Sequence, residues 1–316
     1  MADLDMIIIG AGPAGLTAAQ YAARANLKVL VIEQLSVGGQ ALIIDVLENY
    51  PGNTGTDVSA PKSGYEFAMD LRKQAENFGA SFLFSVVESI KKEDGGFILN
   101  MKDGAKYKAA SVIIAAGSKP RKLKIPGEEE FSGRGVSYCA TCDGNFFKGK
   151  KIFVVGGGDA ACDEARYLSR LSDNVILIHR RDTFRAQKAL AKRTLENPNI
   201  KARFNTVIKE IKGEKKVNSV LLENVLSGET YEEDTDAVFI FAGTVPQSSL
   251  AAGLNAALDD DGYIITDTRM ATNVPGLYAA GDVRSGAFRQ VVTAAADGAV
   301  AAHNAAKYVD EEKILN

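Results

Sequence analysis

Residues 5–33 read DMIIIGAGPAGLTAAQYAARANLKVLVIE, and this stretch decides the fold of the first part of the chain. The apolar run 5–9 predicts a buried strand that leads into the glycine-rich turn GAGPAG. An alanine-rich helix is expected to about Ala25, and a second strand over 28–32 ends at Glu33. A strand, a helix and a second strand in this order predict one β-α-β unit.

The same pattern occurs again in the second half of the chain. The run KKIFVV over 150–155 predicts a strand, the turn GGGDAA follows it, and a helix is expected to about Leu171. The next strand, 174–178, ends at His179. From the first glycine of the turn to the residue that closes the second strand is 23 positions in both copies. The chain therefore contains an internal repeat of one β-α-β unit.

Both turns carry the G-x-G-x-x-G spacing, with an alanine in the last position of the second copy. Alone this spacing is a weak signal, but each copy follows a strand and opens a helix, which is typical of dinucleotide-binding units. The first glycine permits the tight turn, the second lets backbone approach a pyrophosphate, and the third lets helix pack on strand, while the helix N-terminus offers free N–H groups. The expected nucleotide contacts are Gly10, Gly12, Pro13, Ala14 and Gly15 in the first copy and Gly156, Gly158, Asp159, Ala160 and Ala161 in the second.

The residue that closes the second strand indicates which nucleotide each copy holds. Glu33 can accept two hydrogen bonds from a ribose diol and would repel a 2′-phosphate, which favours FAD or NAD(H). His179, Arg180 and Arg181, with Arg185 shortly after, place cationic donors at the same position of the second copy. Guanidinium groups match phosphate oxygens, so the second copy favours NADPH. The alternative for the arginines is a solvated charged surface.

A C-x-x-C pair, Cys139-Ala140-Thr141-Cys142, lies just before the second copy. Two sulfurs at this spacing can form a disulfide, share a metal or be buried as inert core residues. A structural zinc needs about four ligands, and the chain offers only Cys162, His179 and His303 elsewhere. We therefore favour a redox-active disulfide and expect no metal site.

Asp143 directly follows the second sulfur. A carboxyl group there could relay a proton while thiol and thiolate exchange, although a turn residue before Gly144 is the alternative. Cys162 lies on the predicted helix of the second copy and is expected to be a small core side chain that takes no part in the chemistry.

Two strand predictions place the domain boundaries. Each of the runs 108–116 and 236–242 is apolar and is followed by a glycine and a proline-containing segment. The second nucleotide unit is therefore expected as an insertion within the first domain. The predicted domains are 1–117 with 246–316, which would bind FAD or NAD(H), and 118–245, which would bind NADPH and carry the dithiol.

Composition excludes several classes of function. The 316 residues are 46% apolar and 24% charged, with a net charge of −3, so nucleic acid is not expected as a partner. The uncharged run 6–23 contains three glycines and a proline and is not expected to span a membrane. Acidic residues Asp3 and Asp5 stand where a targeting peptide would be basic, and three cysteines are too few for a disulfide framework. We expect a cytoplasmic protein.

The chain resembles a known family, the low-molecular-weight, bacterial-type thioredoxin reductases of the FAD/NADPH pyridine nucleotide-disulfide oxidoreductases. The resemblance runs nearly end to end and rests on GAGPAG, ENYPG, CATCDG, GGGDAA, HRRDTFRA and AAGDV followed by FRQ. It implies an α/β fold of two Rossmann-like, FAD/NAD(P)-binding domains of the three-layer ββα type, the second inserted in the first, and a homodimer. The implied reaction passes electrons from NADPH through non-covalent FAD and the Cys139–Cys142 disulfide to oxidised thioredoxin. A peroxidase or a glutaredoxin-like protein is the alternative partner.

The resemblance also assigns residues to each function. It implies a proton relay at Asp143 and NADPH contacts at Gly158 to Ala161, His179, Arg180, Arg181 and Arg185. The loop 53–63 is several residues longer than the family leads us to expect, and its role is open. The implied FAD contacts, beyond the first glycine-rich turn and Glu33, are Gln34, Gly39, Gln40, Asn49, Val87, Gly117, Gly281, Asp282, Arg289, Gln290 and Val291.

Overall fold

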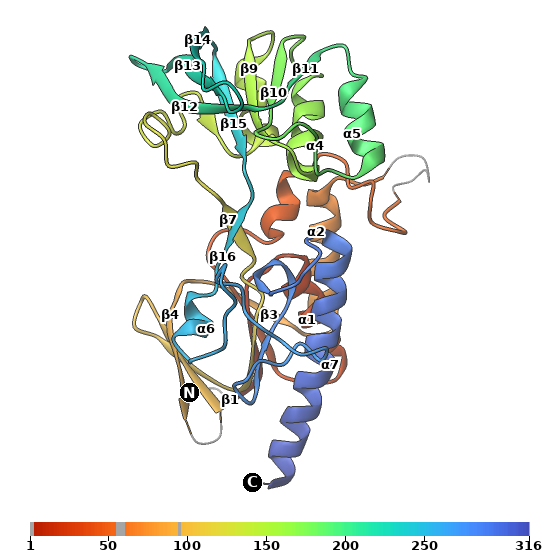
Figure 1. The fold of residues 1–316 in the computed structure, drawn as a ribbon. Coiled ribbons are helices and arrows are strands. Elements are labelled where there is room, and N and C mark those ends of the chain that lie inside the picture. The colour runs from red at the N-terminus through yellow and green to blue at the C-terminus, as the bar shows by residue number, and fades with distance from the viewer. Residues whose placement is uncertain (1–2, 55–60, 94–95, 316) are drawn as a thin grey trace. The chain divides into compact units, whose positions relative to one another are not determined.

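The computed structural model describes residues 3–54, 61–93 and 96–315 (Figure 1). The chain divides into two compact units, Met1–Lys119 with Val245–Asn316 and Pro120–Thr244. The first crossing thus follows residue 119 where 117 is expected, and the return follows residue 244 where 245 is expected. Two short strands at these crossings, β7 (Ser118–Pro120) and β16 (Thr244–Pro246), pair with each other. Residues 55–60 of the long loop lie outside the described residues.

Unit 1, the discontinuous unit, is built on the first β-α-β repeat. Strand β1 (Asp3–Ile9), helix α1 (Pro13–Arg24) and strand β2 (Val29–Glu33) follow one another, and the two strands are parallel with Met6 opposite Val29. Strand β6 (Lys106–Ile114) lies parallel on the other side of β1. The predicted unit is therefore present, and its helix ends one residue earlier than expected.

The other elements of unit 1 extend this sheet and cover it. The seven-stranded sheet has the order β3-β2-β1-β6-β5-β4, with β17 also paired to β6. Pairs β4–β5 and β5–β6 are antiparallel, whereas the strands around β1 are parallel. The further elements are η1 (Gly39–Ile43), α2 (Gly64–Asn77), β3 (Ser81–Phe84), β4 (Val87–Glu93), β5 (Gly96–Met101), α6 (Ser249–Ala252), β17 (Leu277–Ala279), η3 (Gly281–Val283) and α7 (Val291–Leu315).

Side chains of β1 alternate between two cores, as a strand requires. Met6 and Ile8 pack in the core that includes α1, α2 and α7, and Ile7 and Ile9 pack in the core that includes β5. Unit 1 therefore has helices on one face of the parallel strands and an antiparallel β layer on the other. Helix α7, the long blue helix of Figure 1, packs on α1. None of the described helices has the length and apolar character needed to cross a bilayer.

Unit 2 repeats the architecture of unit 1. Its parallel sheet has the order β11-β10-β9-β15-β8, and a separate antiparallel sheet has the order β12-β13-β14. Ile152 and Val154 of β9 pack with the helices, whereas Phe153 packs with the antiparallel sheet. The elements are β8 (Val136–Ser137), α3 (Ala140–Asp143), η2 (Gly144–Phe147), β9 (Ile152–Gly156), α4 (Asp159–Leu168), β10 (Val175–Ile178), α5 (Lys188–Leu195), β11 (Ile200–Arg203), β12 (Thr206–Gly213), β13 (Val217–Asn224), β14 (Thr230–Asp234) and β15 (Ala237–Phe241).

Candidate functional site

The glycine-rich turn of unit 1 forms a backbone cradle between β1 and α1. A Cβ atom on Gly10, whose φ is +102°, would lie 2.4 Å from the oxygen of Ala115, and one on Gly15 would lie 1.9 Å from the oxygen of Gly10. A Cβ on Gly12 would meet nothing within 4 Å. Gly12 is also the N-cap of α1 and provides no side-chain cap for the helix amides. The outer glycines are thus required by packing, while the middle one faces open space, as the glycine of a dinucleotide-binding turn must for backbone to approach a pyrophosphate.

Glu33 is held beside this turn by the backbone. Its Oε2 accepts a hydrogen bond of 2.9 Å from the amide of Ala11, and its Oε1 accepts one of 2.9 Å from the amide of Leu35. Each carboxylate oxygen can accept more than one hydrogen bond. The carboxylate is therefore oriented and still able to receive the hydroxyls of a ribose.

Two segments that are distant in sequence reach the same turn. A Cβ on Gly39, in η1, would lie 3.2 Å from the Cα of Gly12, and one on Gly281, in η3, would lie 2.9 Å from the Cβ of Ala14. The amide of Gly38 donates a 2.7 Å hydrogen bond to the oxygen of Ala11. Three separate stretches of chain, each with sequence-predicted contacts, therefore meet at one place.

Two aspartates near η3 have different environments. Asp297 accepts two hydrogen bonds from Arg284, of 2.9 and 3.1 Å, and one of 3.1 Å from the amide of Gly281. Asp282 is half-buried, and no hydrogen bond from the described residues reaches its carboxylate. Burial raises the pKa of Asp282, and nearby Arg289 opposes this shift. Asp297 thus holds the turn, while Asp282 can accept a ligand hydroxyl.

Two other predicted contacts are amide side chains that hydrogen-bond to distant parts of unit 1. Asn49 donates a 2.9 Å hydrogen bond to the side-chain oxygen of Gln290, which directly precedes α7. Gln40 donates hydrogen bonds of 3.0 and 3.1 Å to the main-chain and side-chain oxygens of Ser118, and a Cβ on Gly117 would lie 4.0 Å from the Gln40 amide nitrogen.

The remaining predicted contacts of unit 1 lie at element ends. Gln34 is exposed after β2, Val291 begins α7, and Val87 begins β4 with its side chain half-buried against the core of the β layer. The guanidinium of Arg289 stacks over the ring of Tyr263, 3.9 Å from its centroid.

The turn of unit 2 has the same construction. A Cβ on Gly156 would lie 2.5 Å from the oxygen of Phe241, whereas one on Gly158, the N-cap of α4, would meet nothing within 4 Å. Asp159 opens α4 and accepts hydrogen bonds of 2.8 Å from both the main-chain and side-chain amides of Gln187. Ala161 is fully buried in the third position. The second cradle therefore also combines packed outer positions with an open middle.

His179 and Arg185 contact the turn of this second cradle at Gly157. His179 is buried, and a Cβ on Gly157 would lie 2.4 Å from its ring. Burial lowers the pKa of His179, and the three arginines lower it further. Its Nε2 atom receives no hydrogen-bond partner from the residues that the structure describes. The amide of Arg185 donates a 2.6 Å hydrogen bond to the oxygen of Gly157, which brings this arginine back to the turn. Arg180, Arg181 and Arg185 are exposed, and none forms an ion pair with a described residue.

The C-x-x-C pair forms a disulfide at the start of α3. Cys139 and Cys142 are bonded, with their Cα atoms 5.4 Å apart. Cys139 caps the short helix, because its Sγ accepts a 3.1 Å hydrogen bond from the amide of Cys142. Cys142 is exposed and Cys139 half-buried. A Cβ on Gly144 would lie 3.0 Å from Leu168 of α4, so the dithiol segment packs on α4, the helix that follows the second glycine-rich turn.

Asp143 has a partner that sequence reasoning did not identify. Its Oδ2 accepts a 2.6 Å hydrogen bond from the hydroxyl of Ser137, a buried residue of β8. Ser137 belongs to no recognisable motif; it lies two residues before Cys139, whose amide donates a 3.1 Å hydrogen bond to its hydroxyl, and the pairing of β8 with β15 holds it in the sheet.

Cys162 is a core residue, as expected. It is fully buried on α4, and burial raises the pKa of its thiol to about 11. Within the described ranges, no group of three or more His, Cys, Asp or Glu side chains is arranged to hold a metal ion.

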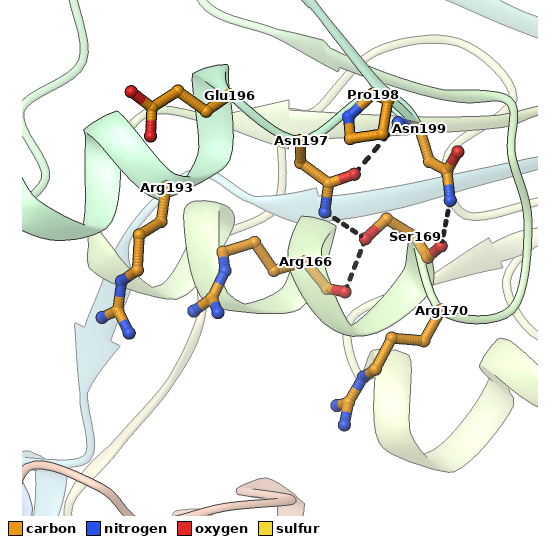
Figure 2. A pocket seen from close by; sticks show the side chains of 8 residues that line it. All are labelled: Arg166, Ser169, Arg170, Arg193, Glu196, Asn197, Pro198 and Asn199. Atoms are coloured by element: carbon orange, nitrogen blue, oxygen red, sulfur yellow. Dashed lines mark hydrogen bonds between the residues drawn. The ribbon is translucent and has the colours of Figure 1, made fainter.

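A separate hollow of about 650 Å³ lies at the C-terminal ends of α4 and α5 (Figure 2). Figure 2 shows three arginine side chains extending to the same side of these helices. Positive charge at helix C-termini offsets the helix dipole. In addition, Arg166 pairs with Asp163 at 3.7 Å and Arg170 stacks on Tyr167 at 4.9 Å. We therefore assign the hollow a structural role. Its lining is Arg166, Ser169, Arg170, Arg193, Glu196, Asn197, Pro198 and Asn199.

Comparisons with known proteins agree on one family. The family model of the pyridine nucleotide-disulphide oxidoreductases matches residues 4–298. A thioredoxin reductase of Treponema pallidum is 57% identical over 308 residues, which is 98% of this chain and 98% of that protein. The crystal structure of Lactococcus lactis thioredoxin reductase in its FR conformation superposes with a TM-score of 0.93 at 42% identity, covering 98% of this chain and 99% of that one. The T. acidophilum thioredoxin reductase gives 0.91 at 37% identity, with the same coverage.

Proposed function

The chain belongs to the pyridine nucleotide-disulphide oxidoreductase family and, within it, to the thioredoxin reductases, and from this premise we propose how its two units divide the reaction. The enzyme reduces the disulfide of thioredoxin with electrons from a nicotinamide nucleotide. In the proposed division, unit 1 binds FAD and unit 2 binds NADPH and carries the dithiol. The overall change is NADPH, H⁺ and oxidised thioredoxin to NADP⁺ and the thioredoxin dithiol.

Unit 1 suits FAD because its residues match the parts of that molecule. When bound, FAD supplies the two-electron carrier between NADPH and the Cys139–Cys142 disulfide. The open backbone at Gly12 would bind the pyrophosphate, Glu33 would accept hydrogen bonds from the adenosine ribose, and Asp282 would accept one from a ribityl hydroxyl. The assignment of Asp282 to the ribityl chain is supported by its carboxylate, which receives no hydrogen bond from the described residues.

Unit 2 suits NADPH rather than NADH because of its arginines. Gly158 leaves the start of α4 open for the pyrophosphate. Arg180, Arg181 and Arg185 follow His179, the counterpart of Glu33 in the repeat, and guanidinium groups bind the oxygens of a 2′-phosphate. Buried His179 would support this segment from behind.

The dithiol acts by thiol–disulfide exchange. A thiolate of the reduced pair attacks the thioredoxin disulfide, and a mixed disulfide forms as one thioredoxin sulfur leaves. The second enzyme sulfur then attacks the mixed disulfide, which re-forms the Cys139–Cys142 bond and releases thioredoxin as a dithiol. Asp143 would carry protons between the sulfurs as they exchange.

The observation that best supports the proposal is the position of the Cys139–Cys142 disulfide. Its segment packs on α4, the helix that begins at the glycine-rich turn proposed to bind NADPH. We propose thioredoxin as the partner, in preference to a peroxidase or a glutaredoxin-like protein, because relatives of 57% and 45% identity are thioredoxin reductases. We also propose a homodimer, which sedimentation would test, and a cytoplasmic location, because a reducible dithiol suits a reducing compartment.

A visible spectrum of the purified protein under anaerobic conditions tests the proposal. We expect a flavin band that bleaches on addition of NADPH, and reduction of thioredoxin at the same NADPH concentration. Cys139→Ser and Cys142→Ser should each abolish thioredoxin reduction while flavin bleaching remains, and Cys162→Ser is the matched control that should keep both. A colourless protein, or thioredoxin reduction by the Cys139/Cys142 double variant, contradicts the proposed function.

A further inference from the structure

We infer that Ser137 is a positioning residue for the reaction and that it acts by holding the carboxylate of Asp143 beside the dithiol. The inference rests on the proton-carrying role proposed above for Asp143. It adds a residue that lies outside every motif of the sequence.

The hydroxyl of Ser137 has three neighbours. Its oxygen lies 2.6 Å from Oδ2 of Asp143 and 3.2 Å from the main-chain oxygen of Cys139, and it accepts a 3.1 Å hydrogen bond from the amide of Cys139. A hydroxyl has one proton to donate. Hydrogen bonds from hydroxyl to carboxylate are short, about 2.5–2.7 Å, and stronger than those between neutral groups. The proton therefore goes to Asp143, and the bond to the Cys139 amide uses a lone pair.

This arrangement links the carboxylate to the backbone of the first cysteine. Ser137 is 5% exposed and lies on β8, where its Cα is paired with Phe239 of the central sheet. Asp143 is the last residue of the four-residue helix α3. Ser137 is the one hydrogen-bond partner that the described residues offer to the Asp143 carboxylate. Without the hydroxyl, that carboxylate would be free to rotate away.

The position of Asp143 matters because protons must move during exchange. Over one cycle the two enzyme thiols lose two protons and the two thioredoxin sulfurs gain two, while the Cys139–Cys142 bond forms and the thioredoxin disulfide breaks. The electron pair moves from the enzyme dithiol to thioredoxin. A carboxylate that carries protons between these sulfurs must be within hydrogen-bond reach of them. A displacement of about 1 Å can reduce a rate about 100-fold.

Steady-state kinetics of the flavin-loaded enzyme test this with Ser137→Ala, Asp143→Asn and the double variant. Ser137→Ala should lower kcat for thioredoxin reduction about 10- to 100-fold, with KM for thioredoxin and bleaching of the flavin by NADPH unchanged. The double variant should be no slower than Asp143→Asn alone, because the serine acts only through the aspartate. Ser137→Thr, which keeps the hydroxyl, should restore most of the rate.

Ser172→Ala is the matched control. Ser172 is also buried in unit 2, at 4% exposure, and its hydroxyl bonds the oxygen of Lys150, so its loss should leave kcat unchanged. A normal kcat in Ser137→Ala, or losses that multiply in the double variant, would overturn the inference about Ser137 while leaving Asp143 in place. A normal rate in Asp143→Asn would instead refute the proposed proton carrier, and the inference would fall with it.

Discussion

The side chain of Asn49 donates a 2.9 Å hydrogen bond to that of Gln290, which lies 241 positions later in the sequence. Asn49 precedes the inserted unit in the chain and Gln290 follows it. The bond therefore joins the two parts from which unit 1 is assembled. Because the predicted FAD contacts are divided between these two parts, we propose that FAD affinity depends on their docking as well as on the glycine-rich turn.

We predict that Glu33→Ala weakens FAD binding about 10- to 100-fold. Each hydrogen bond to a charged group contributes about 1.5–3 kcal/mol, and 1.4 kcal/mol is a factor of ten in affinity. Titration of the flavin-free protein with FAD, followed by fluorescence, measures the effect. Denaturation of the unmodified protein should release FAD.

Glu88→Ala is the control for this change, because Glu88 is an exposed carboxylate on β4 of the same unit. Its FAD affinity should equal that of the unmodified protein. Release of FMN on denaturation, or equal affinities for the Glu33 and Glu88 variants, would refute the assignment of unit 1.

We predict that Arg180→Ala raises KM for NADPH roughly 10- to 100-fold and changes KM for NADH little. Loss of a charge-assisted contact to the 2′-phosphate of NADPH costs about 1.5–3 kcal/mol. NADH lacks this phosphate, so the substitution removes no contact to NADH. Arg170→Ala is the matched control, because this arginine stacks on Tyr167 in the hollow at the end of α4. Equal use of NADH and NADPH by the unmodified enzyme would be incompatible with the prediction.

The sequence was sufficient to predict the two β-α-β units because their signals are local. The predicted ends of helices were less accurate, because side chains near these ends form hydrogen bonds with backbone groups of the helix. The helix expected to about Leu171 ends at Leu168, since the hydroxyl of Ser169 bonds the oxygen of Arg166 and the amide of Asn199 donates to the oxygen of Ser169. The sequence also suggests a helix start near Phe288, but α7 begins at Val291, where the Thr293 hydroxyl accepts a hydrogen bond from the amide of Gln290.

Contacts between distant segments could not be predicted from the sequence. The charged segments 211–216 and 227–236 suggest hairpins on the surface, and turns do occur there, but Ile211 is buried at 2% exposure in a sheet of three strands. The bond between Ser137 and Asp143 joins residues only six positions apart, but it depends on how the chain turns from β8 into α3, which no sequence motif marks. The burial of Ile211, in contrast, is set by tertiary packing.

We predict that Gly298→Ala destabilises unit 1 even though alanine is the better helix former. A Cβ at position 298 of α7 would lie 2.1 Å from the oxygen of Ala14 in α1. Helix propensity favours alanine by about 1 kcal/mol, but overpacking a tight contact costs about 1–3 kcal/mol or more. We expect the overpacking to dominate, with a lower midpoint in thermal unfolding.

Gly253→Ala provides the comparison for this variant. Gly253 follows α6 with a φ of −61°, and a Cβ there would lie 3.5 Å or more from its neighbours. Its unfolding midpoint should match or exceed that of the unmodified protein. An unchanged midpoint for Gly298→Ala would show that α1 and α7 can separate without loss of stability.

We predict that Cys162 makes the free energy of unfolding fall as pH rises from 9 to 11. Burial raises the pKa of this thiol from its ordinary value of 9.0 to about 11. Above pH 9 the unfolded chain loses the thiol proton while the folded chain keeps it, so the unfolded state binds fewer protons and stability decreases with pH. The decrease amounts to about 1.4 kcal/mol per pH unit within this interval and ends once the folded thiol also ionises.

Denaturant unfolding of the unmodified protein and of Cys162→Ala, at pH 8, 9, 10 and 11, measures this term. Tyrosines and lysines also titrate in this range, so the difference between the two proteins is the relevant quantity. The variant should be less stable at pH 8, because a buried side chain is truncated, and the gap should narrow by about 2–3 kcal/mol by pH 11. A gap that stays constant across the series would mean that the Cys162 thiol ionises equally in the folded and unfolded chains.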